Sequence, residues 1–166
     1  MEIGTVLASQ LQASLTTLEN SLSGCPDAEW DACHGDAPFS QVAFHALFYC
    51  DFYLSGSEQE FRNQEFHRDN KAFFDDYEEL EDRIPAHLYS RAALEKYLAF
   101  CRKKAGTVVP ALDAAQLEEP PLMRRSLFSR MELFIYLTRH IQHHAAQLGL
   151  RMQLLTGREM KWVSRG

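Results

Sequence analysis

Three histidines lie within five positions near the C-terminus, in the sequence RHIQHHAAQLG at residues 139–149. At about 100° per residue, His140 and His144 share one face of a helix, one turn apart, and His143 lies at the edge of that face. This spacing lets two imidazoles bind one metal ion, as they do in HExxH zinc sites. Ile141 follows His140 where that motif has glutamate, so a protease of the HExxH type is not indicated.

A metal site with two histidines needs a third ligand, and His45 is the candidate. It lies on the apolar face of a predicted helix, beside Val42. We expect His45, His140 and His144 to hold a divalent metal ion and to leave at least one position open for water or substrate. Imidazole ligands favour zinc or nickel, and iron or manganese also fit. The alternative is that the inward histidines are core residues satisfied by hydrogen bonds.

Four more residues are candidates for the surroundings of this site. Gln147 is a candidate to orient a ligand, while Tyr49 and Phe48 are candidates to line a pocket. His143 is expected either to support the site or to lie at the surface. No catalytic residue is assigned. The other histidines lie in loop-like regions and show no functional pattern: His34, His67 and His87.

Four amphipathic segments predict the helices that carry these side chains. They run roughly over residues 3–22, 40–54 and 90–104, followed by about 27 residues that end at Thr156. Gly106 and Pro110 are expected to end the third helix. Four such helices in one chain predict an all-α fold, a four-helix bundle.

Local signals predict where two of these helices begin. Ser40 is placed to cap the second helix. Ser129 and Glu132 fit a capping box for the last one, with Phe128 and Leu133 placed as a hydrophobic staple across it.

A long acidic connection separates the second and third helices, over residues 57–87. From residue 57 to 82 it has ten Asp or Glu against three Lys or Arg, yet it also carries Phe61, Phe66, Phe73, Phe74 and Tyr77. We interpret it as a connection that packs its aromatic rings over the bundle and leaves its charges in water. A lid or a partner surface is the alternative.

Length and composition limit the class of protein. A chain of 166 residues suits a single domain over 1–166. A net charge of −6 argues against nucleic acid as the main partner, because phosphate binding needs a basic face. The N-terminus does not resemble a signal peptide and no apolar run is long enough for a membrane span, so we expect a cytoplasmic protein without membrane contact. Four scattered cysteines without a CxxC pattern do not indicate a thiolate metal site.

The segment His140-Ile141-Gln142-His143-His144-Ala145-Ala146-Gln147 resembles the C-terminal HxxHHxGQ motif of the DinB/YfiT-like family. His45, in the segment FSQVAFH, is similar to the histidine that the family carries in its second helix. Ala146 stands where the family often has glycine. The order of these motifs and the four predicted helices agree over nearly the whole chain.

The resemblance implies an up-down-down-up four-helix bundle with a metal ion bound by His45, His140 and His144. It also implies a small-molecule substrate, with a homodimer as a plausible assembly. Characterised members resemble thiol-dependent S-transferases and isomerases that use low-molecular-weight thiols such as bacillithiol or mycothiol. A metal with an open position suits this chemistry because it lowers the pKa of a bound thiol. The alternatives are a metal-dependent hydrolase and a non-enzymatic metal-binding or ligand-binding stress protein.

Overall fold

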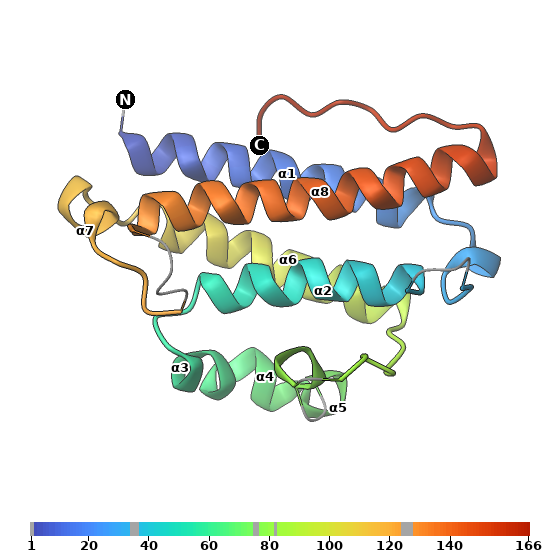
Figure 1. Cartoon of the computed structure of the whole chain (residues 1–166), viewed down its shortest axis with the longest axis horizontal. Helices are drawn as coiled ribbons and strands as arrows, with labels where there is room; N and C mark the ends of the chain where they lie inside the picture. Colours follow the sequence, from blue (N-terminus) through green and yellow to red (C-terminus); the bar gives the residue numbers. More distant parts are fainter. Residues whose placement is uncertain (1, 34–36, 75–76, 82, 124–127) are drawn as a thin grey trace.

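The computed structural model describes residues 2–33, 37–74, 77–81, 83–123 and 128–166, and the regular elements in these ranges are all helical. Four long helices lie side by side (Figure 1): α1 (Ile3–Gly24), α2 (Phe39–Tyr53), α6 (Arg91–Val108) and α8 (Arg130–Thr156). The short elements are η1 (Asp27–Glu29), α3 (Glu58–Asn63), α4 (Glu65–Asp69), α5 (Lys71–Phe74), η2 (Glu78–Leu80) and α7 (Ala114–Glu118).

The core lies between the four long helices, because each turns an apolar stripe toward the others. Helices α1 and α2 each contact both α6 and α8. The stripe of α1 is fully buried at Leu11, Leu15 and Leu18, three to four residues apart as the sequence predicts. On α8, Leu137 and Ile141 are equally buried. The apolar periodicity therefore predicts the inward face of these helices correctly.

Two predicted helix ends differ from the structure. Helix α2 begins at Phe39, after Pro38, without a side-chain cap. The hydroxyl of Ser40 donates to Asp31 Oδ1 at 2.5 Å, so the predicted cap by Ser40 is wrong. Helix α6 continues through Gly106 to Val108, because one glycine costs a helix only about 1 kcal/mol and buried packing offsets that cost.

Helix α8 matches its predicted length of 27 residues, but its first turn differs in detail. Ser129 accepts a hydrogen bond from the backbone N–H of Glu132, as predicted. The Glu132 carboxylate, however, accepts from the backbone N–H of Phe128 at 2.7 Å. Phe128 is 86% exposed, so the predicted staple with Leu133 does not form. The helix ends where Gly157 adopts φ 69°, a conformation that glycine tolerates best.

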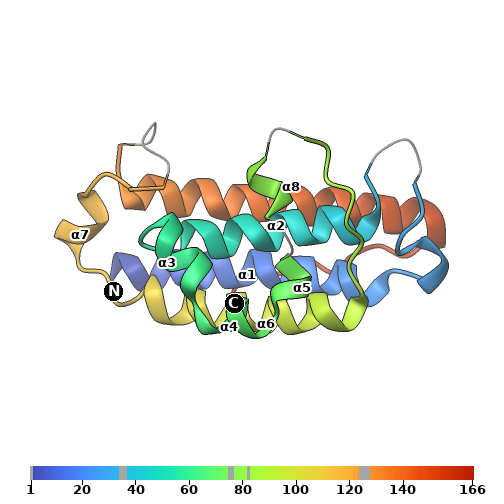
Figure 2. The same cartoon turned by 90° about the horizontal axis from the view of Figure 1, so that it is seen from below.

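The acidic connection folds into α3, α4, α5 and η2, and the first three cover the side of α2 and α6 that faces away from α1 and α8 (Figures 1 and 2). Its aromatic rings pack on the bundle as predicted, with Phe61 and Phe74 buried. The prediction that its charges stay in water is wrong in part. The side chains of Glu78 and Glu79 are each only 6% exposed, because both accept hydrogen bonds inside the fold.

Asp51, a fully buried residue of α2, joins the acidic connection to the bundle. Its carboxylate accepts hydrogen bonds from His67 Nε2 at 2.8 Å, from Tyr97 Oη at 3.0 Å and from Lys104 Nζ at 2.6 Å. These donors come from α4 and α6, so one carboxylate links three helices. Gln64, the residue that separates α3 from α4, donates to the same carboxylate.

Within the described ranges, none of the helices has both the length and the apolar character needed to cross a membrane.

Candidate metal centre

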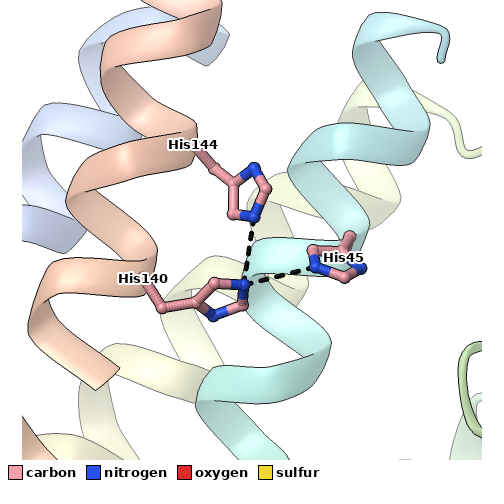
Figure 3. Close-up of side chains that lie close together, drawn as sticks. All are labelled: His45, His140 and His144. Atoms are coloured by element: carbon pink, nitrogen blue, oxygen red, sulfur yellow. Dashed lines mark hydrogen bonds between the residues drawn. The ribbon is translucent and has the colours of Figure 1, made fainter. Parts of the chain in front are cut away.

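Three imidazole nitrogens converge at the surface between α2 and α8 (Figure 3). His140 Nε2 lies 3.2 Å from His45 Nε2 and 3.0 Å from His144 Nε2. His140 and His144 come from successive turns of α8, and His45 faces them from the middle of α2. The structure therefore brings together the three residues that the sequence predicts as ligands, although His45 and His140 are 95 residues apart along the chain.

The spacing of these nitrogens fits a metal ion. A tetrahedral ion with Zn–N bonds of 2.0–2.1 Å separates its ligand atoms by about 3.3 Å. The two measured separations are close to this value, and the ligand atoms of all three histidines lie within 4.8 Å of one another. Each histidine is partly exposed, so the cluster is open on one side rather than closed by protein. Three imidazoles suit zinc, nickel or iron better than a hard cation such as calcium.

Glu79 of η2 contacts His45 at the ring nitrogen that does not face the other two histidines. Its Oε2 lies 2.8 Å from His45 Nδ1, and its side chain is only 6% exposed. A carboxylate at this nitrogen accepts the Nδ1–H and thereby leaves the Nε2 lone pair of His45 facing the other two histidines. Tyr49 also holds η2 against α2, since its hydroxyl donates to the backbone carbonyl of Glu79 at 3.0 Å.

His144 is held in a neutral state that suits a metal ligand. Burial lowers its pKa to about 4, with a further lowering from His45. Gln147 partly opposes this shift through a hydrogen bond, because its Oε1 lies 3.2 Å from His144 Nδ1. At pH 7 the ring therefore carries one proton, and the contact with Gln147 places that proton on Nδ1. The Nε2 lone pair then points toward His140.

The other predicted neighbours of the site have different positions. Tyr49 lies beside it, with ring centroids 4.9 Å from His45 and 5.7 Å from His140. His143 is exposed and contacts the ring of His144. Phe48 is fully buried among core aromatic rings, so it does not line an open pocket as expected. Phe48 follows His45 by three residues, so the two side chains are about 60° apart around α2, and that of Phe48 points into the core.

Sequence reasoning missed Glu79 and His67. Glu79 is one of ten acidic residues in the connection, and neither its neighbours nor its spacing distinguishes it from the exposed ones. The sequence places His67 in a loop-like region, whereas the structure buries it on α4 against Asp51. The combination of acidic residues with five aromatic rings was the available signal, because it showed that this segment packs against the bundle. His34 lies outside the described residues.

Tyr136 completes the surroundings of His140. Its ring stacks on His140 with centroids 6.1 Å apart and also meets the edge of Tyr53. Two tyrosine rings, Tyr49 from α2 and Tyr136 from α8, thus border His140. They give the open side of the cluster an apolar margin with hydroxyl groups, a surface suited to a small organic molecule.

Comparison with known proteins agrees with this geometry. Neither the curated proteins nor the solved structures contain a match to the chain. A model of the DinB superfamily, in contrast, matches residues 10–148, a range that includes all three clustered histidines and most of the four long helices. The chain therefore belongs to the DinB superfamily.

Proposed function

We propose that this protein is a metal-dependent enzyme, most closely a thiol-dependent S-transferase or isomerase, with a divalent ion held by His45, His140 and His144. The observation that carries the proposal is the convergence of three Nε2 atoms, with separations of 3.0 and 3.2 Å, at a partly exposed site. Zinc or nickel is the proposed ion. The small-molecule substrate would include a low-molecular-weight thiol.

A divalent ion with an open position would supply Lewis acidity, which makes a thiolate available near neutral pH. The residues of the chain prepare this site. Glu79 holds the proton of His45 on Nδ1, and Gln147 does the same for His144. Tyr49 and Tyr136 lie beside His140 and offer aromatic rings against which a small molecule could pack. Glu79 is engaged by His45, which argues against its service as the general base that hydrolysis requires.

The up-down-down-up order of a single four-helix domain is part of the proposal. It is supported by the course of the chain in Figure 1, in which α1 and α8 run in one direction and α2 and α6 in the other. Helix α8 is also an immediate neighbour of α2, the arrangement that a site shared by His45 and His140 needs.

The first experiment tests the metal site. Tag-free wild type, His140→Ala and His143→Ala are incubated with zinc or nickel, desalted and submitted to elemental analysis. We expect close to one ion per chain in the wild type and in His143→Ala, and little in His140→Ala. His143 is the matched control because it lies on the same helix but outside the converging set. Equal metal in all three proteins, or none in any, would refute the site.

The second experiment tests the reaction. Metal-loaded wild type is mixed with a low-molecular-weight thiol and a chlorinated aromatic electrophile, and thioether formation is followed by absorbance. Catalysis in the wild type that is lost in His140→Ala supports the S-transferase. Metal-dependent cleavage of a nitrophenyl ester without thioether formation would instead support the hydrolase. The absence of both reactions would favour a binding protein.

A further inference from the structure

An open cavity of about 630 Å³ lies over the outer face of α8, between α1 and the C-terminal tail, residues 157–166. Arg139, His140, Gln142 and His143 of α8 line one side of it, and Trp162 of the tail lines another. His140 belongs both to this lining and to the histidine cluster. A molecule in the cavity would therefore border one of the three candidate metal ligands, His140.

The lining of this cavity differs in charge from the rest of the chain. Among the described residues, it includes no Asp or Glu side chain. Residues 130–166 carry six Lys or Arg against two Asp or Glu, a net charge of +4, whereas residues 1–129 carry eleven against twenty-one, a net charge of −10. Arg139 is exposed at the cavity and forms no ion pair with a described residue. Arg139 is the one Lys, Arg, Asp or Glu side chain in the described lining, so the cavity is a local positive site on an acidic protein.

The tail holds Trp162 over this positive site. On one side of Trp162, the Met160 side chain accepts a hydrogen bond from Ser21. It also packs so closely on Gly149 that a Cβ there would lie 2.0 Å from its Cε. On the other side, the backbone carbonyl of Ser164 accepts from Gln10 Nε2 at 3.3 Å.

The indole of Trp162 remains 81% exposed although residues on both sides of it are attached to the bundle. Because Trp162 also lines the cavity, its exposed indole is available to a molecule that enters there. Trp162 offers a face for stacking, and Arg139 offers a planar cation that pairs with a carboxylate in two parallel hydrogen bonds. The two groups together select a molecule with an apolar part and an anionic end.

We propose that this cavity binds a small organic carboxylate, with its carboxylate on Arg139 and its apolar part against Trp162. The cavity then serves as the subsite that orients the substrate of the neighbouring histidine cluster, a role that rests on the proposed function. The proposed substrate is therefore a molecule that bears a carboxylate and whose reacting end extends from the cavity, past His140, to the histidine cluster. Carboxylate binding itself needs no metal, so the subsite is testable without it.

The test uses the full chain, labelled with 5-fluorotryptophan and kept metal-free with EDTA. The chain has two tryptophans, and the ¹⁹F resonance of Trp162 is assigned with Trp162→Phe, a change at an exposed side chain that leaves the core intact. The probe is 3-phenylpropionate, and its neutral counterpart is 3-phenylpropanamide. We expect a saturable shift of the Trp162 resonance with the acid and at least about tenfold weaker binding of the amide, since a charge-assisted pair is lost.

Two variants separate Arg139 from general charge effects. Arg139→Gln should weaken binding of 3-phenylpropionate by about tenfold. Arg158→Gln removes the same charge from the start of the tail but does not line the cavity, and it should bind as the wild type does. Equal binding of acid and amide, no saturable shift with either, or unchanged binding by Arg139→Gln would overturn the proposal. Binding of the acid by a protein that takes up no metal would refute the proposed function and leave the subsite standing.

Discussion

Glu79 Oε2 lies 2.8 Å from Nδ1 of His45, on the opposite side of the ring from the nitrogen that faces His140. This contact joins the acidic connection to the histidine cluster. A carboxylate behind a ligating imidazole fixes the orientation and tautomer of the ring and raises its basicity. The connection is therefore part of the candidate metal centre, although none of its residues belongs to the converging set.

Replacement of Glu79 should weaken metal binding without abolishing it. Glu79→Ala removes the acceptor at His45 Nδ1, so we expect the dissociation constant for zinc to rise by about 10–100-fold. Glu79→Gln keeps an acceptor but loses the charge, so its dissociation constant for zinc should lie between those of the wild type and Glu79→Ala. Competition with a chromophoric chelator measures these constants. Glu81→Gln is the matched control, because Glu81 is exposed and pairs with Arg83. Unchanged zinc affinity in Glu79→Ala would show that the contact does not tune the site.

Replacement of Asp51 should destabilise the fold rather than the site directly. Asp51→Asn leaves Lys104, whose side chain is only 13% exposed, beside a neutral group, and breaking a buried ion pair costs about 3–5 kcal/mol in the free energy of unfolding. Urea denaturation followed by circular dichroism measures this cost. Asp69→Asn, a change at an exposed carboxylate of α4, should stay within about 0.5 kcal/mol of the wild type. Similar midpoints for both variants would contradict the role of Asp51.

The contribution of Asp51 should depend on pH. Burial raises the pKa of this carboxyl group, but the hydrogen bond from His67 and the charge of Lys104 together lower it by more. The pKa in the folded protein is therefore below the ordinary value of 3.8. A lowered pKa in the folded state means that the stabilisation is complete above pH 3.8 and disappears as pH falls through the folded-state pKa. The difference in unfolding free energy between wild type and Asp51→Asn should therefore be constant near neutral pH and shrink in acid. A difference that grows in acid would have the wrong sign.

The four cysteines should differ sharply in reactivity. Cys33 is exposed, whereas Cys25, Cys50 and Cys101 are buried. Burial raises the pKa of Cys25 to about 11, although Arg91 and Arg151 partly oppose the shift. At pH 8 only about one Cys25 thiol in a thousand is then ionised. Brief treatment with iodoacetamide, followed by mass spectrometry, should modify one site, and Cys33→Ser should remove that modification. Rapid labelling of two or more thiols would contradict the buried positions.

The sequence predicts the long helices and the histidine cluster well, because both follow from a period of 3.6 residues. The i, i+4 pair on α8 must face one direction, and His45 shares the inward stripe of α2. The sequence does not predict the contacts of the acidic connection. Which of its charges is buried depends on partners such as His45, which is 34 residues from Glu79, and no local pattern records that pairing. The exposed position of Phe128 is likewise a tertiary outcome, not a local one.

The link from Asp51 to His67 and Gln64 has a consequence for hydrogen exchange. The segment from α3 to η2 opens as one unit if its buried polar partners separate from α2 and α6, and each opening withdraws Glu79 from His45. The three imidazoles keep their places during such an opening, so the cluster alternates between a supported and an unsupported form. An ion that binds the supported form more tightly opposes the opening. Backbone amides of residues 58–74 and 77–80 should then exchange more slowly in the metal-loaded protein, although none of those residues would contact the ion.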